Sequence, residues 1–495
     1  MVKISTKEAP ERVIEREQWG ALFNRTPQGR ISQRPFGGHT YRRLCHVGDR
    51  TGLEMIRTLQ EKVLTTDARV YMETTVTKLF KDASGRVVGA LAYIRESGSF
   101  VHFKVKAVIM ATGGWGRIFK VTSNSWEGTG DGCVLAYDAG AELVDMEMVQ
   151  FHPTGMVWPP GVRGILVTEG VRGEGGVLRN AEGERYMERY DPERMELSTR
   201  DRIALANYTE IAEGRGTEHG GVYLDISHRP KKYILEKLPR MYRQFLEALM
   251  LDISKSPMEV APTAHYTMGG IVVDPETHAT DVEALYAAGE NTSGLHGANR
   301  LGGNSLSETM VFGRRAGEAA AKFSAECDVQ LRSRSAIKVA GEELDSYIKE
   351  GDEFARPLQR ALRNTMQETC GVLRSEEKLN EGLERLAQIR AASEDVDVRP
   401  TSEGFGDLTY ALDLRGSLVV AESTILGAIE RRETRGAHNR SDYPELDPNL
   451  KVNFIVSKGD GEITVVREQV HVVPEQLEEW AKSGEEYQAA GRLVE

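Results

Sequence analysis

Cysteine is scarce in this sequence, and the few present follow no functional pattern. Four occur in 495 residues, Cys45, Cys133, Cys327 and Cys370, and no two of them form a C-x-x-C pair. A zinc ribbon, a disulfide framework and a cysteine-ligated iron–sulfur cluster within these residues are therefore excluded. We expect a reducing compartment and no metal site.

Long hydrophobic runs and concentrated positive charge are lacking as well. No apolar stretch approaches the ~18 residues of a membrane-spanning helix, and the opening "MVKISTKEAPERVIE" has no apolar core of an export signal. The net charge is -12 without a basic stripe, which argues against nucleic acid as a partner. The motifs G-x-S-x-G and H-E-x-x-H are absent. These absences leave a globular protein of more than one domain.

Glycine, in contrast, is plentiful, and it clusters where a nucleotide would be bound. The chain has 50 glycines, about a tenth of its residues against the usual ~7%. The segments "KAVIMATGG" (106–114) and "ALYAAGEN" (284–291) each read as a short buried strand that runs into glycine, the edge where α/β sheets bind nucleotides. A predicted helix, "SLSETMVFGRRAGEAAAKF", starts directly after the glycines of "LHGANRLGGNS", so its first amides can face an oxygen-rich ligand.

Periodicity predicts the remaining elements. Helices are expected at "PERVIEREQWGALF" from Pro10, followed by a hairpin, and at 50–64 and 130–141. A strand, a turn at 82–85 and a second strand are expected within 68–94. The middle, 152–266, looks less regular. Helices fill 333–432, and strands are predicted in the tail "NFIVSKGDGEITVVREQVHV".

Charged side chains and histidines occur in several short segments, here called islands, most of which contain Gly or Pro. These are "QFHPTG" with His152, "LVTEGVRGEGG" with Thr168, Glu169 and Arg172, "LSTRDRIA" with Arg200 and Asp201, "TAHYTMGG" with His265, and "LHGANRLGGNS" with Arg300. Each island alone has a simple structural explanation, such as a solvated Arg–Asp pair. Taken together, two histidines and two arginines suit a dicarboxylate, because guanidinium groups match carboxylates in a bidentate geometry.

The motifs occur in an order that resembles one family. They are "QRPFGG", "ATGG", "TGDG", "DMEMVQFHPTG", "LVTEGVRGEGG", "HYTMGG", "LYAAGE", "HGANRLGGNSL" and "ETRGAHNRSDYPE". In this order, over about residues 10 to 445, they resemble the flavoprotein subunit of succinate dehydrogenase and fumarate reductase. L-aspartate oxidase and soluble fumarate reductases are the alternatives. The helical segment and the further C-terminal region favour the respiratory-complex subunit.

The resemblance implies an α/β fold with several domains. A FAD-binding Rossmann-like domain (1–151 and 267–328) would carry an inserted α+β capping domain (152–266), followed by a helical domain (329–434) and a small C-terminal region (435–495). The family opens with a βαβ unit that carries G-x-G-x-x-G, and no such motif occurs here. The FAD domain is therefore expected to be N-terminally incomplete, and a non-catalytic fragment unable to hold FAD is a further alternative. His39 follows "QRPFGG", a later loop, so the family's covalent flavin link is not transferred to it.

The resemblance also implies roles for individual residues. Arg200 matches the arginine that transfers the proton when succinate and fumarate are interconverted by hydride transfer with FAD, and Glu169 and Arg172 match its proton relay. The residues that match substrate contacts are Phe36, Gly37, His152, Thr168, His265 and Arg300. The residues that match flavin contacts are Ala111, Thr112, Gly113, Asp131, Glu290, Arg300, Ser305 and Leu306.

Partners follow from the resemblance and from the missing cysteine pattern. A flavin reduced by two electrons must pass them on singly, and this chain has no cluster to receive them. The resemblance implies an iron–sulfur subunit, which would rest on a membrane anchor subunit. The chain is accordingly expected to be cytoplasmic and peripheral on the inner (plasma) membrane.

Overall fold

The computed structural model describes residues 1–328, 333–401, 405, 407–459, 462–470, 475 and 479, and it contains a pair of short parallel strands. β6 (Val108–Met110) pairs in parallel with β13 (Leu285–Ala287). Glycine-containing segments follow both strands, and α3 (Asp131–Ala139) and α9 (Asn304–Glu326) come later along the chain. The strand-to-glycine units predicted at 106–114 and 284–291 are therefore present, and the structure pairs them side by side.

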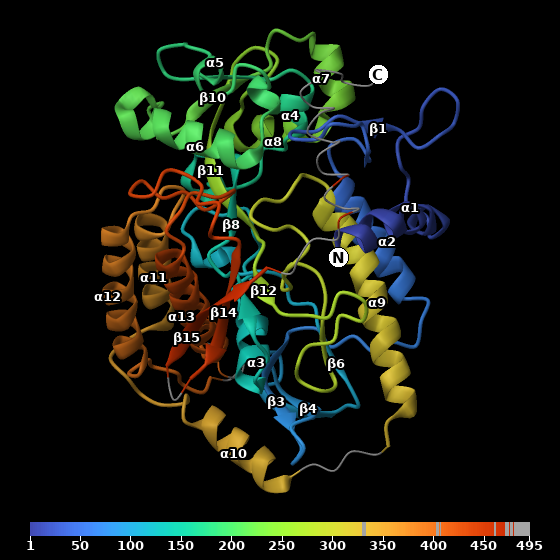
Figure 1. The fold of residues 1–495 in the computed structure, drawn as a ribbon, viewed down its shortest axis with the longest axis vertical. Helices are drawn as coiled ribbons and strands as arrows, with labels where there is room; N and C mark the ends of the chain where they lie inside the picture. Colours follow the sequence, from blue (N-terminus) through green and yellow to red (C-terminus); the bar gives the residue numbers. More distant parts are fainter. Residues whose placement is uncertain are drawn as a thin grey trace.

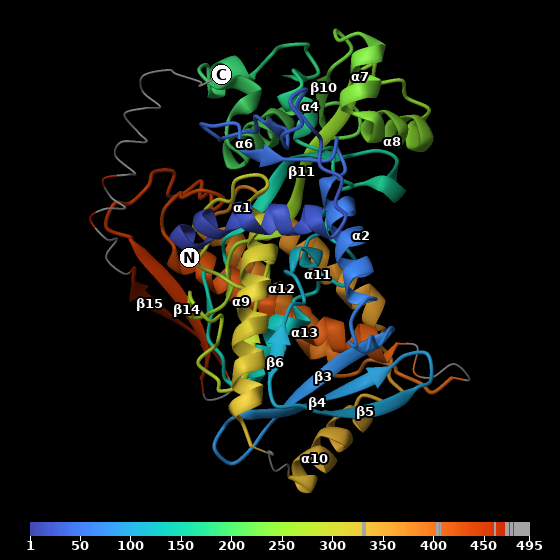
Figure 2. The same ribbon diagram turned by 90° about the vertical axis from the view of Figure 1, so that its right-hand side faces the viewer.

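A three-stranded antiparallel meander lies at one end of the molecule (Figure 2). It consists of β3 (Thr74–Lys81), β4 (Val87–Ile94) and β5 (Ser99–Lys104), in the order β3-β4-β5. The first two strands and their turn are as predicted. β5 was not predicted, because as a largely exposed edge strand it shows no clean alternation of apolar and polar residues.

A second antiparallel sheet forms the opposite end (Figure 1). It contains β8 (Val149–Met156), β9 (Val177–Arg179), β10 (Val222–Asp225) and β11 (Met258–Thr267), in the order β8-β11-β10-β9. Around it are the short helices α4 (Gly170–Gly173) and α5 (Met187–Tyr190) and the longer helices α6 (Arg200–Glu210), α7 (Lys231–Lys237) and α8 (Pro239–Leu249). These elements share one apolar core. The prediction of a less regular middle is wrong, because β9 and β10 have only three and four residues and lie between charged loops, so they give little periodicity.

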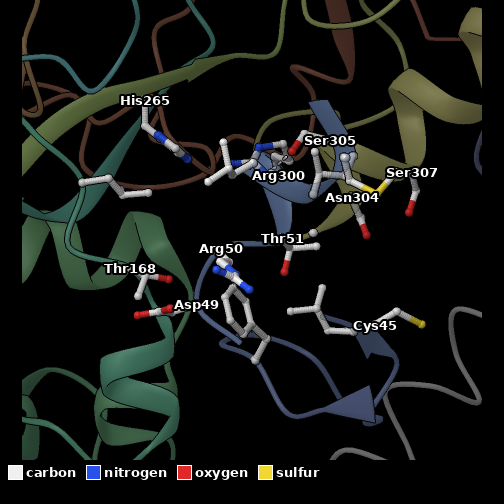
Figure 3. A pocket seen from close by; sticks show the side chains of 18 of the residues that line it. Cys45, Asp49, Arg50, Thr51, Thr168, His265, Arg300, Asn304, Ser305 and Ser307 are labelled. Atoms are coloured by element: carbon white, nitrogen blue, oxygen red, sulfur yellow. Dashed lines mark hydrogen bonds between the residues drawn. The ribbon is translucent and has the colours of Figure 1, made fainter. Parts of the chain in front are cut away.

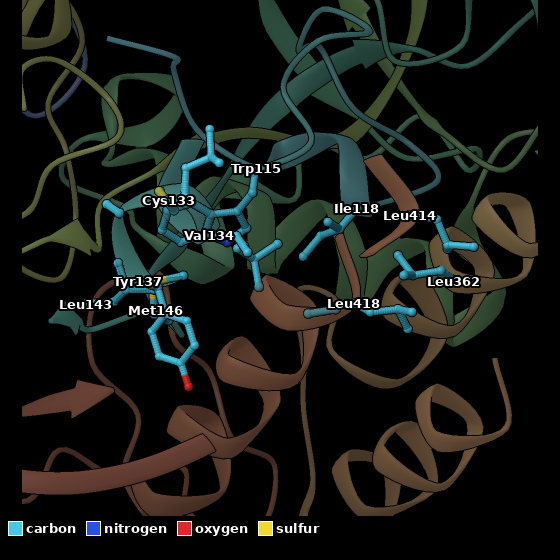
Figure 4. Close-up of a cluster of buried hydrophobic side chains, with 14 of the residues drawn as sticks. Trp115, Ile118, Cys133, Val134, Tyr137, Leu143, Met146, Leu362, Leu414 and Leu418 are labelled. Carbon is cyan, nitrogen blue, oxygen red and sulfur yellow. The ribbon is translucent and has the colours of Figure 1, made fainter. Parts of the chain in front are cut away.

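A group of helices packs against α3. α11 (Ala355–Thr369), α12 (Glu376–Ser393) and α13 (Leu408–Glu430) pack together, and α10 (Arg334–Asp345) lies against the meander. Leu362, Leu414 and Leu418 of this group share one apolar core with Ile118, Trp115 and Val134 (Figure 4). A hairpin of β14 (Val452–Lys458) and β15 (Ile463–Gln469) joins β7 (Leu143–Val144) and β12 (Gly270–Ile271) in a four-stranded sheet.

The N-terminal helix lies across α9 (Figure 2). α1 (Val2–Gln18) begins eight residues before the predicted start and contains Pro10 in its interior, so the predicted boundary is wrong. A proline is favoured in a first helical turn, which is why the boundary was placed there. Ion pairs from Glu8 to Arg315 and from Glu15 to Arg314, the latter at 3.2 Å, fix α1 on α9.

Three further elements belong to the N-terminal part of the chain. They are β1 (Gln33–Arg34), β2 (Leu44–Cys45) and α2 (Thr51–Val63). Within the described part of the chain, every helix is too short or too polar to cross a membrane.

Candidate active site

A cavity of about 1130 Å³ is walled by segments from distant parts of the sequence. Its walls come from α1, the β1–β2 region, the start of α2, α8 and the first turn of α9. Figure 3 shows Thr168, His265, Arg300 and Ser305 around it. Of the predicted site residues, the structure places these seven at its wall: Phe36, Thr168, Arg200, His265, Arg300, Ser305 and Leu306. The cavity is large enough for a cofactor together with a small substrate.

The charge of the cavity wall is strongly positive although the whole chain is acidic. Asp49 is the one carboxylate among the described lining residues. The lining arginines are Arg34, Arg43, Arg50, Arg117, Arg163, Arg200, Arg240 and Arg300. Such a concentration of one sign in a low-dielectric recess attracts anions. The site is thus suited to a ligand with several negative charges.

Arg200 forms a buried ion pair at the start of α6. Its Nε donates to Oε2 of Glu169 at 2.7 Å, and Nη2 of Arg172 lies 3.7 Å from the same oxygen. All three side chains are buried. Burial alone would raise the pKa of Glu169, but the two guanidinium groups and a hydrogen bond from the Gly37 amide outweigh it and lower the pKa. Glu169 is therefore a carboxylate held between two arginines, one at the cavity and one behind it.

Two histidines on neighbouring strands face each other. His152 of β8 and His265 of β11 have ring centroids 5.1 Å apart. Burial, followed by the charge of Arg200, lowers the pKa of both imidazoles well below the usual value, so both rings are neutral. Nε2 of His152 is buried without a protein partner. A buried N–H without a partner is costly, and a ligand oxygen would satisfy it.

Arg300 reaches the cavity from the loop before α9. Its Nη1 lies 3.2 Å from Ser305 Oγ, and its guanidinium stacks over the Tyr266 ring at 4.3 Å. Burial, then the nearby charge of Arg200, lowers the pKa of Arg300 to about 10. Its Nε is buried and unpartnered. Arg300 therefore retains donor capacity for an anionic ligand.

The sequence interpretation missed Gln150, which joins the two arginines. Its Oε1 lies 3.3 Å from Nη1 of Arg200 and 3.2 Å from Nη2 of Arg300. Its Nε2 donates to the Arg300 carbonyl and to Asn299 Oδ1, both at 2.7 Å. Gln150 lies two residues before His152 in "QFHPTG". Because alternate residues of a strand point to one face, that spacing was the available signal.

Two glycines allow these groups to lie close together. A Cβ on Gly37 would lie 2.4 Å from Glu169 Oε1, the atom to which the Gly37 amide donates at 2.6 Å. A Cβ on Gly302 would lie 2.4 Å from the Phe36 ring and 2.9 Å from Arg200 Nη2. A larger residue would displace Glu169 at the first position, and Phe36 or Arg200 at the second.

Of the residues expected to contact a flavin, the cavity wall includes Arg300, Ser305 and Leu306, but not Ala111, Thr112, Gly113 or Glu290. Ala111 and Thr112, directly after β6, are exposed, and Gly113 has φ +75 with no atom within 4 Å of an added Cβ. Burial raises the pKa of Glu290, after β13, to about 7. Ser305 lies in the first turn of α9, where the positive end of the helix dipole favours a negatively charged group. An open glycine loop, a buried carboxyl group and a helix start together fit FAD.

Asp131 is not at the wall of this cavity. It begins α3, accepts a hydrogen bond from Thr129 at 3.3 Å, and faces a separate small hollow together with Asp413. Burial raises its pKa. Gly132, the next residue after Asp131, lies close to Thr112, a predicted flavin contact: a Cβ on Gly132 would lie 1.9 Å from Thr112 Oγ1. A flavin contact from Asp131 stays a prediction.

The fold and site define a flavin-dependent oxidoreductase, and family models agree. The model of the FAD binding domain matches residues 1–306, and that of the fumarate reductase flavoprotein C-terminal region matches residues 359–482. The chain belongs to the succinate dehydrogenase/fumarate reductase flavoprotein family, and its cofactor is FAD.

Individual relatives cover nearly the whole chain. One polypeptide of the fumarate reductase (CoM/CoB) from Methanothermobacter marburgensis is 46% identical, over 92% of this chain and 83% of the relative. The succinate dehydrogenase flavoprotein subunit of Coxiella burnetii is 38% identical, over 93% of this chain and 82% of the relative. A solved structure of FrdA from E. coli quinol fumarate reductase superposes with a TM-score of 0.89 at 34% identity, covering 95% of this chain and 84% of FrdA.

Proposed function

We propose that this chain is the flavoprotein subunit of a succinate dehydrogenase/fumarate reductase complex and interconverts succinate and fumarate. The observation that carries the proposal is that Arg200, His265 and Arg300 line one cavity, with Glu169 bonded to Arg200 and the neutral His152 packed against His265. The ion pair suits proton transfer, and the remaining donors suit two carboxylates. The family supplies the expectation of the substrate.

Each residue then has a defined task. His152, His265, Arg300 and Thr168 hold the substrate carboxylates, and Phe36 and Gly37 close the wall beside them. When bound, FAD supplies the two-electron redox chemistry. Arg200 donates a proton to a substrate carbon in reduction and accepts one in oxidation. Arg172 and Glu169 replace that proton through the contacts of 3.7 Å and 2.7 Å that join the three side chains.

The cofactor contacts and domain roles complete the proposal. We assign flavin binding to these residues: Ala111, Thr112, Gly113, Asp131, Glu290, Arg300, Ser305 and Leu306. Segments 1–151 and 267–328 form the flavin domain in this scheme, 152–266 the capping domain, 329–434 the helical domain and 435–495 the C-terminal region. The sheet of the capping domain supplies both histidines, which orient the substrate in this scheme.

Electrons leave this chain for another polypeptide. No cluster of His, Cys, Asp or Glu side chains in the described part of the chain is arranged to hold a metal ion. Electrons from a two-electron cofactor need a one-electron carrier, so an iron–sulfur subunit is the proposed partner. We place the complex on a membrane anchor subunit, with this chain peripheral on the cytoplasmic face.

The test measures cofactor and activity in the same sample. The purified chain is expected to be yellow with a flavin absorbance, to reduce fumarate with a reduced viologen dye as electron donor, and not to oxidise L-aspartate. Oxidation of aspartate but not succinate would select L-aspartate oxidase instead. A colourless chain without turnover would instead support the alternative of a non-catalytic fragment. A second experiment separates native membranes from the soluble fraction. If the fumarate-reducing activity stays in the soluble fraction and no cysteine-rich partner co-purifies, a soluble fumarate reductase is favoured.

A further inference from the structure

Ser123 has no role in the proposal so far, yet it contacts a histidine at the cavity wall. Its Oγ lies 2.7 Å from Nδ1 of His265, and both residues line the cavity. The main chain around Ser123 is tied to the strand that carries this histidine: the Ser123 amide donates to the Ala264 carbonyl at 2.9 Å, and Thr122 forms a parallel bridge with Ala264. The hydroxyl is therefore fixed relative to the imidazole.

The hydrogen-bond network determines the direction of this contact. The Ser123 hydroxyl has one proton and two acceptors in range, Nδ1 of His265 at 2.7 Å and the Ala264 carbonyl at 3.4 Å. The carbonyl already accepts the Ser123 amide, and 3.4 Å is long for an O–H donor. The hydroxyl thus donates to Nδ1. Because a neutral imidazole that accepts at one nitrogen carries its proton on the other, His265 has Nε2–H.

The neighbouring His152 has the same tautomer for an independent reason. The Thr154 amide donates to Nδ1 of His152 at 3.2 Å, and an amide N–H can only donate. The Thr154 carbonyl, also 3.2 Å from Nδ1, already accepts the Val167 amide at 2.9 Å. His152 therefore also carries its proton on Nε2, the atom that is buried without a partner.

The surroundings keep both rings neutral. Burial is the largest cause of the lowered pKa of both. Arg200 further raises the cost of a proton on either ring, Arg300 does so for His265, and Arg172 and the other ring do so for His152. Two neutral N–H donors, 5.1 Å apart between ring centroids, are the result.

We propose that Ser123 is a positioning residue that locks His265 as an Nε2–H donor and thereby makes the site selective for a carboxylate over a carboxamide. A carboxylate offers only acceptors to the two N–H groups. A carboxamide offers an NH₂ group as well, which would face a donor. The inference rests on the proposed function, since it concerns how the same site recognises a dicarboxylate.

The variants Ser123→Ala and Ser123→Thr separate this role from folding. Alanine frees Nδ1 and lets the ring take either tautomer, whereas threonine keeps the hydroxyl. We expect Ser123→Ala to raise the Kd for malonate, a non-reacting dicarboxylate, about tenfold, and to raise KM for fumarate with little change in kcat. The variant should also lower the ratio of kcat/KM for fumarate to kcat/KM for the monoamide of fumarate. Ser123→Thr should restore all three, and Ser254→Ala, which removes a hydroxyl bonded to Asp252, should change none.

Nitrogen-15 NMR of the histidine rings tests the tautomer without turnover, with His265→Gln to assign the signals. A neutral Nε2–H ring in the wild type that becomes a mixture in Ser123→Ala supports the proposal. Malonate affinity and amide discrimination unchanged in Ser123→Ala would overturn it, as would an Nδ1–H ring in the wild type. If the wild type binds malonate and reduces fumarate while Ser123→Ala behaves identically, only the inference fails. If the wild type binds no dicarboxylate, the proposed function fails first and the inference with it.

Discussion

Arg200 and Arg300 share one acceptor, because Oε1 of Gln150 lies 3.3 Å from a guanidinium nitrogen of the first and 3.2 Å from one of the second. Two cations held this close in a buried place repel each other. That repulsion is the second cause, after burial, of the lowered pKa of Arg300. A dianion bound between them would offset the repulsion. The two guanidinium groups therefore favour binding of a dicarboxylate.

Gln150→Leu should weaken substrate binding. The variant removes one acceptor from each guanidinium group and the side-chain donor to the Arg300 carbonyl. We expect KM for fumarate to rise about tenfold and the free energy of unfolding to fall by about 1–3 kcal/mol, measured by steady-state kinetics and urea unfolding. Gln359→Leu, also buried and bonded to the Tyr410 carbonyl, is the matched control. It should lower stability only, and an equal KM in the two variants would show that Gln150 has no special role.

Arg200→Lys should abolish turnover but not cofactor binding. Lysine cannot donate to Glu169 and reach Gln150 in the geometry of the guanidinium group, so proton transfer loses its donor. We expect kcat to fall by roughly 10²–10⁴, with flavin absorbance unchanged in the same sample. Arg202→Lys, which changes an exposed arginine paired with Asp191, should keep its activity. A kcat within about threefold of the wild type would remove Arg200 from the mechanism.

Glu169→Gln should lower stability in a pH-dependent way. The pKa of Glu169 is lower in the folded chain than its ordinary value of 4.5, because the two arginines outweigh burial. Such a group adds stability above its unfolded pKa, and that stability is lost as pH falls through the folded pKa. The variant should therefore unfold more easily near neutral pH, by about 3–5 kcal/mol. The difference should shrink below pH 4.5 in urea titrations at several pH values. If the difference in free energy of unfolding between the wild type and the variant stayed constant at acidic pH, the charge of Glu169 would not be its cause.

Gly302→Ala should displace Arg200, although the two residues are far apart in the sequence. The new methyl group would meet the Phe36 ring at 2.4 Å and Arg200 Nη2 at 2.9 Å, so one of them must move. We expect kcat/KM to fall by about tenfold or more, because small displacements of a catalytic group are costly. Gly313→Ala in α9 places its methyl group in open space and should leave kcat/KM unchanged. Equal kinetics in both variants would contradict the contact.

The sequence predicted the local features well where periodicity or glycine was strong. The strands before Gly113 and Gly289, the long helix after Gly303 and the helices of 333–432 all formed close to the predicted ranges. It failed at α1, where Pro10 lies inside the helix, and at the short strands β9 and β10. A proline and three- or four-residue strands give signals that long-range packing overrides.

By itself, the sequence determined the kinds of chemistry available: histidine, arginine and glutamate in glycine-rich islands, with no cysteine cluster to receive electrons. The resemblance to a family then ordered those islands. Only the tertiary structure decided that His152 and His265 face each other across paired strands, that Gln150 joins two arginines, and that Ser123 fixes a tautomer. These contacts link residues up to 150 positions apart, and no local pattern encodes the register and packing that bring such residues together.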